Sequence, residues 1–392
     1  MTRRRILVVA MVDSIHTARW LNQFRDEPLD VEVFPSTPHR RLHPLVRELA
    51  DGSHVMRLRI SPGMRRLALV WGVADLFVAN RIRMHLLSRR IRAFRPDLLH
   101  AMETQHAGYL SAAAVPRHSA LPVVLSVWGS DFRWFGDRPR HATRIAGLLR
   151  RTDRLVVECT RDEAFARAHG YVGPRAIRVP ASGGVEAVSS PRPPSHRTTV
   201  AVKGYSGFVG LGPETVRALG ASADVLGTRT IVVFSCGLRT RLTAAWVRRR
   251  SGLDLRCVAK HALSHAAMLA LLADARVVVS LSRSDGFPGV VREALAHGTF
   301  VVHSDTACLE DWVPDQSLIR TVDVGSRASM RHDMRAALQD ALTDDELVDR
   351  AATVLGGHAA ATWGPSAARR ALDGLYDRLI DDGLVRRSVT NP

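Results

Sequence analysis

The chain has 392 residues, of which 46% are hydrophobic and 24% are charged, a composition that excludes a disordered chain. A chain of this length is too long for a single domain with one hydrophobic core and suits two domains of roughly 150–200 residues. The four cysteines are widely spaced and form no C-x-x-C pair. This argues against a zinc site or a disulfide framework and fits a reducing cytoplasm.

The formal net charge is +17, and only Lys203 and Lys260 among the 55 basic residues are lysines. Such a charge attracts phosphates, nucleic acid or anionic lipid. Alternatively, it reflects a coding bias toward arginine, with the charge spread over solvated faces, and both interpretations stay open. No helix-turn-helix, zinc-finger or aromatic stacking pattern is present, so we expect no nucleic-acid partner.

Two apolar segments are candidates for a targeting or membrane segment. The run from Ile6 to Val12 meets Asp13 and is too short for a signal peptide, so we predict a strand there. Leu67–Asn80 is interrupted by Asp75 and is too short to cross a bilayer. The sequence therefore predicts a cytoplasmic protein without a membrane-spanning helix.

Short apolar runs alternate with helix-length segments along the first half of the chain. Predicted strands are Ile6–Met11, Val31–Phe34, Val55–Leu58, Leu98–His100, Val123–Val127, Leu155–Glu158 and Ala176–Val179. Predicted helices are Thr17–Arg25, Gly72–Phe94 and Arg138–Arg150. This alternation indicates an α/β domain with a parallel sheet covered on both faces.

Residues 186–197, EAVSSPRPPSHR, contain three prolines and three serines and predict a linker. The alternation then restarts. Predicted strands are Thr199–Lys203, Thr230–Phe234, Leu255–Ala259, Val277–Ser280, Phe300–His303 and Leu318–Arg320. Predicted helices are Pro213–Leu219, Arg239–Arg250, His265–Asp274, Gly289–His297, Arg327–Leu342, Asp345–Leu355 and Pro365–Asp382.

The whole pattern predicts an α/β protein with two doubly wound, Rossmann-like domains in series. The expected boundaries are residues 1–185, the linker, 198–362, and a C-terminal helix at 363–385 that crosses back to the first domain. Ligands in such sheets bind at the carboxyl ends of the strands, where helix N-termini point free N–H groups at anions. We therefore expect a binding cleft between the two domains.

The segment from Ser282 to Gly298, SRSDGFPGVVREALAHG, carries the chemistry. It follows a buried strand, and Pro288 suits the first helical position while Gly298 suits the αL position just past the helix. Strand, glycine turn and helix N-terminus together predict a site for a diphosphate. Asp285 and Glu293, in the spacing D-x7-E, are suited to accept hydrogen bonds from sugar or ribose hydroxyls, because a carboxylate repels phosphate.

The segment resembles the donor motif of family four glycosyltransferases, retaining enzymes of GT-B fold whose usual pattern is E-x7-E. Here Asp285 stands where the first Glu is usual. The resemblance extends more weakly to DSIHTARW at 13–20, PDLLH at 96–100, WGSD at 128–131, Gly183–Val185 and Lys203–Tyr205. It implies transfer of a sugar from a nucleotide-diphosphate donor to a hydroxyl acceptor, without metal or cofactor.

The resemblance also assigns roles in the donor site. Glu293 would bind the ribose hydroxyls, Asp285 the transferred sugar, and the N–H groups of Phe287 to Val290 would lie beside the diphosphate. Lys203 would neutralise the diphosphate, with Lys260 as a candidate second charge, because Leu211 stands where relatives often have Arg. The expected donor-site residues are Lys203, Gly204, Lys260, Asp285, Gly286, Phe287, Pro288, Gly289, Val290 and Glu293.

Polar residues also follow the strands of the first half. His106 and Asp131 are candidate catalytic residues there, with Asp131 expected to position the acceptor hydroxyl. Asp13, Ser14, His16 and Glu103 follow neighbouring strands. Trp128 stands where related enzymes often have a His sugar contact.

Three matters stay open. The acceptor is a cell-envelope glycan, a glycolipid or a small molecule. Ten arginines between Arg57 and Arg95 are interleaved with apolar residues. They form either a surface for anionic lipid or a buried helix with a solvated flank. The first alternative implies peripheral attachment to the inner face of a membrane. The alternatives to a transferase are a degenerate, non-catalytic GT-B partner that binds nucleotide sugar, and a GT-B nucleotide-sugar epimerase.

Overall fold

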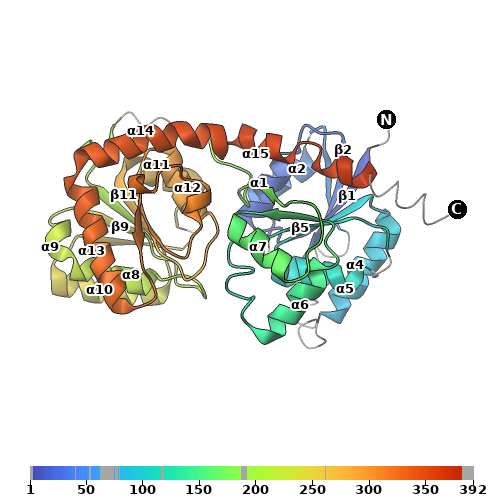
Figure 1. The fold of residues 1–392 in the computed structure, drawn as a ribbon, viewed down its shortest axis with the longest axis horizontal. Helices are drawn as coiled ribbons and strands as arrows, with labels where there is room; N and C mark the ends of the chain where they lie inside the picture. The colour runs from blue at the N-terminus through green and yellow to red at the C-terminus, as the bar shows by residue number, and fades with distance from the viewer. Residues whose placement is uncertain are drawn as a thin grey trace. The chain divides into compact units, whose positions relative to one another are not determined.

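The computed structural model describes residues 3–381 except 40, 53, 62–74, 76–77, 79, 116–118, 187–191 and 261. The chain forms two compact units, unit 1 from Met1–Gly184 with Ala368–Pro392 and unit 2 from Val185–Ala367. Each unit has one parallel sheet with helices on both faces (Figure 1). The doubly wound α/β fold predicted from the sequence is confirmed.

Unit 1 contains a seven-stranded sheet in the order β3-β2-β1-β4-β5-β6-β7. Its strands are β1 Arg4–Ala10, β2 Leu29–Pro35, β3 Arg57–Ile60, β4 Leu98–Met102, β5 Val123–Ser126, β6 Arg154–Val157 and β7 Ile177–Arg178. Its helices are α1 Ile15–Asn22, α2 Pro44–Asp51, α4 Arg81–Phe94, η1 Thr104–Gly108, α5 Tyr109–Ala114, α6 Pro139–Leu149 and α7 Thr160–Ala168.

The central strand β1 is buried on both faces, because its side chains alternate between two apolar cores. Ile6 and Val8 pack with Trp20 of α1, whereas Leu7 and Val9 pack with Leu87 of α4. Continuous apolar runs of this kind are typical of parallel strands covered by helices on both sides. This explains why the sequence pattern located the strands well.

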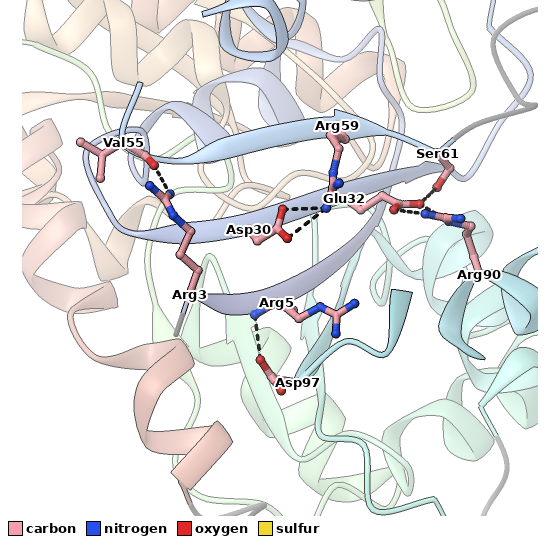
Figure 2. A network of polar contacts seen from close by, with 9 residues as sticks. All are labelled: Arg3, Arg5, Asp30, Glu32, Val55, Arg59, Ser61, Arg90 and Asp97. Carbon is pink, nitrogen blue, oxygen red and sulfur yellow. Dashed lines mark hydrogen bonds and ion pairs between the residues drawn. The ribbon is translucent and has the colours of Figure 1, made fainter. Parts of the chain in front are cut away.

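The edge of this sheet carries a network of ion pairs (Figure 2). Arg59 donates to both carboxylate oxygens of Asp30 at 2.9 and 3.0 Å. Glu32 on β2 is buried, accepts a 2.6 Å hydrogen bond from Ser61, and forms an ion pair with Arg90 of α4. A buried carboxylate needs such partners, and this one ties α4 to the sheet.

The C-terminal segment belongs to the core of unit 1. The hydroxyl of Tyr376 forms a 2.9 Å hydrogen bond with Nδ1 of His100 and accepts a second one, of 3.2 Å, from Nε1 of Trp20. Leu375 and Ile380 are buried in the same apolar cluster. The chain therefore returns to the first unit as the sequence predicts.

Unit 2 contains a six-stranded sheet in the order β10-β9-β8-β11-β12-β13. Its strands are β8 Thr199–Lys203, β9 Ile231–Cys236, β10 Leu255–Ala259, β11 Ala275–Ser280, β12 Phe300–Ser304 and β13 Arg320–Val322. Its helices are α8 Gly212–Ala221, α9 Ala223–Leu226, α10 Leu238–Ser251, α11 His265–Asp274, α12 Gly289–Ala296, α13 Arg327–Thr343 and α14 Asp345–Thr362, with α15 Pro365–Leu372 leading back to unit 1.

Several predicted boundaries were wrong. Helix α14 continues through Gly356 and Gly357, because its buried residues on both sides of this pair hold it against unit 2. The predicted helix Pro365–Asp382 is broken at Gly374, whose φ of 63° requires the left-handed region. Helices α2, α5, α7 and α9 were not among the segments named from the sequence. Most of the predicted helix Gly72–Phe94 before α4 lies outside the described residues.

No helix in the described part of the chain is long and apolar enough to cross a membrane.

Candidate functional site

The predicted donor segment forms a strand, a turn and a helix at the carboxyl edge of the sheet in unit 2. Strand β11 ends at Ser280, and helix α12 runs from Gly289 to Ala296. Pro288 is the residue before the helix, one position earlier than predicted, and Gly298 has the predicted positive φ of 65°. The first N–H groups of α12 and its dipole therefore lie where the sequence predicts an anion site.

The turn before α12 is fixed by its aromatic residue. Phe287 is buried, its ring stacks on Trp312 with centroids 5.0 Å apart, and it meets Trp363 edge-on at 5.3 Å. Because the Phe287 side chain belongs to the core, only its backbone is available to a ligand. Such packing holds the backbone of Gly286 to Gly289 in one conformation and so pre-organises the site.

Asp285 and Lys203 come together at this edge. Lys203 is the last residue of β8, and β8 is the direct neighbour of β11 in the sheet. Its Nζ atom lies 4.0 Å from Oδ2 of Asp285, and both side chains are about a quarter exposed. A carboxylate and an ammonium group thus share one partly open position at this edge of the sheet.

Glu293 lies on the first turns of α12 and is almost completely buried. Its Oε1 atom is 2.8 Å from Nε2 of His265, the first residue of α11, whose side chain is 42% exposed. His265 was not predicted as a site residue from the sequence. A histidine that opens a helix gives no signal by itself, because the contact joins residues 28 positions apart in the chain.

The segment from Gly204 to Gly212 brings backbone close to backbone. A Cβ atom on Gly212 would lie 2.3 Å from the carbonyl oxygen of Gly204, so no other residue fits there. Thr240 of α10 donates a 2.8 Å hydrogen bond to the same carbonyl. The glycines therefore permit a tight loop at the end of β8, whose carboxyl end faces the same edge as β11.

Leu211 is buried at the start of α8 and belongs to the core of unit 2. The turn after β11 brings another cation, Arg283, against the same loop, and this residue was not predicted from the sequence. Arg283 donates to the carbonyl of Gly210 at 3.2 Å and lies 3.4 Å from Glu214. Because 53 of the 55 basic residues are arginines, the place of Arg283 in the sequence could not distinguish it from the others.

Lys260 follows β10 at the same edge of the sheet. Its backbone N–H donates to Cys236 at 3.1 Å, and its Nζ atom lies 5.7 Å from the centre of the Tyr205 ring. A cation over an aromatic face is stabilised by the ring quadrupole. Lys260 is therefore held beside the glycine loop, although it makes no ion pair with Asp285 or Glu293 in the described structure.

In unit 1, Glu103 and Asp131 follow neighbouring strands, and a hydrogen bond from the loop of Glu103 to Asp131 joins their two loops. Glu103 directly follows β4, has a φ of 76°, and accepts hydrogen bonds from the N–H groups of Gln105, His106 and Ala107 at 2.6–2.9 Å. Oδ2 of Asp131 accepts from the N–H groups of Thr104 and Trp128 at 2.9 and 3.0 Å. Both carboxyl groups are thus used to hold the loops after β4 and β5.

Burial dominates the electrostatics of this pair. It raises the pKa of Glu103 to about 8, with the nearby Asp131 adding to the shift and backbone donors opposing it. Burial also raises the pKa of Asp131 to about 7 against the same kind of backbone donors. Such shifts in a loop region are typical of functional sites as well as of structural networks.

His106 lines a cavity of about 70 Å³ together with Arg83, Tyr109 and Arg144. Desolvation and the charges of Arg83 and Arg144 lower the pKa of His106, which favours a neutral imidazole. His16, which follows β1, lies 5.0 Å ring to ring from Trp128. The polar residues expected after β1, β4 and β5 therefore do gather at one edge of the first sheet.

Among the described residues, no three His, Cys, Asp or Glu side chains are grouped so as to hold a metal ion.

Comparison with known proteins agrees with this arrangement. Residues 5–158 match a family model described as glycosyl transferase 4-like, and residues 218–340 match one described as glycosyl transferases group 1. Together these segments make up more than half of the chain. The chain belongs to the family four glycosyltransferases.

Solved structures of glycosyltransferases share the fold of this family member. HepE of Anabaena, solved with UDP and glucose, has a TM-score of 0.68 at 13% identity over 96% of this chain and 100% of its own. Sucrose-phosphate synthase of Thermosynechococcus elongatus has 0.65 at 15% identity, over 97% and 100%. An α,α-trehalose-phosphate synthase (UDP-forming) of Burkholderia vietnamiensis has 0.67 at 12% identity, over 96% and 100%. No curated protein has a significant sequence match to the chain.

Proposed function

We propose that this glycosyltransferase moves a sugar from a nucleotide-diphosphate donor to a hydroxyl acceptor with retention of the anomeric configuration and without a metal ion. Unit 2 binds the donor. The observation that carries the proposal is the joint position of Lys203, Asp285 and Glu293 around the turn that opens α12. The solved neighbours crystallised with UDP or named for UDP-forming chemistry support a nucleotide-sugar donor.

In this proposal each group in unit 2 has one task. The N–H groups of Phe287 to Val290 and the Lys203 ammonium stabilise the negative charge of the leaving diphosphate. Glu293 accepts hydrogen bonds from the ribose hydroxyls, replacing its contact with His265, and Asp285 accepts from the transferred sugar. The backbone of Gly204 lies beside the diphosphate, where a side chain would obstruct it, and Lys260 adds a second positive charge.

The bond changes balance without a further base. The acceptor oxygen forms a bond to the anomeric carbon as the bond from that carbon to the diphosphate oxygen breaks. The proton of the acceptor hydroxyl passes to the departing diphosphate oxygen on the same face. Positioning and electrostatic stabilisation then supply the acceleration.

Asp131 and His106 of unit 1 are proposed to act on the acceptor side. Since Oδ2 of Asp131 already accepts two backbone hydrogen bonds, we assign Asp131 the positioning of its loop and of the acceptor hydroxyl. We propose that neutral His106 accepts a hydrogen bond from the acceptor beside Arg144. We also propose a cytoplasmic location, since nucleotide sugars are cytoplasmic metabolites.

Donor binding is tested first by thermal unfolding against a panel of nucleoside diphosphates and their sugars, beginning with UDP and UDP-glucose. A ligand that binds only the folded state raises the midpoint by mass action. We expect the diphosphates to raise it and the matching monophosphates to do so less. If no nucleotide on the panel raises the midpoint, the donor assignment is wrong.

Turnover and stereochemistry are tested with the best donor and a panel of glycosides, sugar phosphates and simple alcohols. Release of nucleoside diphosphate measures transfer or hydrolysis, and proton NMR of the product gives the anomeric configuration. We expect an α-linked donor to give an α-linked product, with EDTA leaving the rate unchanged. An inverted product contradicts retention, and binding without any turnover favours the non-catalytic partner.

A further inference from the structure

Helix α10 of unit 2 presents an apolar stripe to solvent. Leu238, Leu242 and Trp246 are 69%, 63% and 52% exposed. Residues four positions apart lie one above the other on a helix, so these side chains form one continuous line. They are three of the eight large hydrophobic side chains exposed in the described part of the chain, and no other helix there contributes three.

The same helix is strongly basic. It carries Arg239, Arg241, Arg248, Arg249 and Arg250, all exposed, and no acidic residue. None of these five arginines is in an ion pair within the described structure, whereas Arg335 of α13 and Arg320 of β13 in the same unit are each paired with an aspartate at 2.5 and 2.7 Å. The positive charge on α10 is therefore left uncompensated by the fold.

A recess of about 570 Å³ adjoins the stripe, between α8, α10 and α13. These three helices cover the same face of the sheet in unit 2 (Figure 1). The recess has an apolar lining, formed by Ala218, Ala221, Val247 and Met330. Trp246 of the stripe also lines it. Its charged lining residues are Arg217, Arg250, Arg327 and Arg331, against the single acid Glu214.

We propose that α10 and the adjoining recess dock the protein on an anionic lipid surface. Trp246 and the two leucines enter the boundary between headgroups and acyl chains, and the arginines contact lipid phosphates. Charge complementarity selects this occupant. A second copy of the chain would bring two arginine-rich faces together, and nucleic acid would leave the apolar stripe without a partner.

This docking surface on α10 differs from the possible lipid surface that the sequence indicates between Arg57 and Arg95. The apolar centre of that earlier candidate, residues 67–71, lies outside the described residues and belongs to unit 1 of the chain. The proposal for α10 also does not depend on the proposed sugar transfer. Neither its three apolar residues nor its arginines are assigned to donor or acceptor binding.

The apolar stripe is tested on the full chain by co-sedimentation with vesicles of phosphatidylcholine alone or mixed with phosphatidylglycerol. The variant L238Q/L242Q/W246Q is expected to lose about tenfold or more in apparent affinity for the mixed vesicles, since three anchors leave the membrane. The matched control V172Q/V354Q removes exposed apolar side chains elsewhere. It is expected to bind like the wild type.

The charge is tested by comparing two triple variants. R241Q/R248Q/R249Q on α10 is expected to weaken binding about tenfold or more and to reduce its salt dependence. R81Q/R89Q/R92Q removes the same charge from exposed positions on α4. It is expected to bind nearly as well as wild type.

Clear results overturn the proposal. Wild-type binding by the L238Q/L242Q/W246Q variant shows that α10 does not dock. Equal losses in the two arginine variants show that only the overall charge of +17 matters. Equal binding to neutral vesicles excludes recognition of anionic lipid. Circular dichroism and the midpoint of thermal unfolding identify any variant that has lost its fold.

Discussion

Both units place carboxylates in the segments that follow parallel strands, but give them different partners. In unit 1, Glu103 and Asp131 accept hydrogen bonds from backbone N–H groups of their own loops. In unit 2, Glu293 contacts the side chain of His265, and Asp285 lies beside Lys203 while accepting a single backbone hydrogen bond, from Gly286. Backbone donors are fixed in place, whereas side-chain partners can move aside for ligand hydroxyls.

In the proposed function, this contrast separates acids that hold loops in place from acids that bind the donor. Removing an acceptor from fixed, buried N–H groups leaves those groups without a hydrogen bond and costs stability. Removing an acid whose partner is a movable side chain costs little stability but removes a contact with the ligand. Single substitutions at matched positions in the two units can therefore confirm or break the comparison.

The largest expected effect is that of Glu293→Gln. The amide keeps the size of the side chain but accepts hydrogen bonds more weakly and has no charge. We expect kcat/KM for the best donor to fall about 100-fold or more, with little change in the unfolding midpoint. The matched control is Glu310→Gln, an exposed acid of the same unit, which is expected to retain activity.

Glu103→Ala tests the other half of this contrast. Three backbone N–H groups lose their acceptor, so we expect a loss of about 2–3 kcal/mol in the free energy of unfolding. Urea unfolding measures it. If Glu293→Gln destabilises the protein as much as Glu103→Ala does, the distinction between the two pairs of acids is wrong.

The sequence predicted most strands well for a physical reason, although β3 and β13 each begin two residues later than predicted. Strands such as Thr199–Lys203 and Leu255–Ala259 are short apolar runs between polar turns, and both were placed at their observed bounds. Helix α12 was predicted from local signals, namely the glycine turn, Pro288 and Gly298. Local patterns suffice where the determining residues are neighbours in the chain.

Contacts between distant segments could not be predicted. His265 meets Glu293 only after α11 and α12 pack together, and Arg283 meets Gly210 only after β11 lies beside β8. The role of Glu103 also depends on its backbone conformation, since a φ of 76° turns its carboxylate toward the following N–H groups. These features depend on tertiary packing.

The two lysines offer the next comparison, within unit 2. Lys203 lies 4.0 Å from Asp285, whereas Lys260 lies over the Tyr205 ring. We expect Lys203→Gln to weaken binding of the nucleoside diphosphate about tenfold or more, as loss of a charge-assisted hydrogen bond does. Lys260→Gln is expected to weaken it about threefold, and calorimetric titration distinguishes the two. The reverse order would assign the diphosphate to Lys260.

The pH dependence of stability tests the protonated acids of unit 1. A carboxyl group with a pKa raised to about 7 in the folded state keeps its proton there while the unfolded chain has lost it. The folded state is therefore favoured at low pH, and stability falls as pH rises through 7. Because the carboxyl groups of Glu103 and Asp131 titrate together, the free energy of unfolding should fall between pH 6.5 and 8 as the pair loses its protons.

Asp131→Asn removes this titration while keeping an oxygen that accepts from Thr104 and Trp128. We expect the urea midpoint of the variant to change less between pH 6.5 and 8 than that of the wild type. Asp340→Asn, on the half-exposed Asp340 of unit 2, serves as the control and should follow the wild type. Parallel pH curves for all three proteins would show that Asp131 is ionised throughout this range.

The smallest expected effect concerns His265, the side-chain partner of Glu293. Because His265 is 42% exposed, water can replace its hydrogen bond to Glu293 when the side chain is removed. His265→Ala should therefore raise the KM for the donor only about threefold and leave kcat nearly unchanged. His332→Ala, an exposed histidine on α13, is the control. A loss as large as that of Glu293→Gln would mean that His265 itself binds the donor, because a replaceable orienting contact cannot account for it.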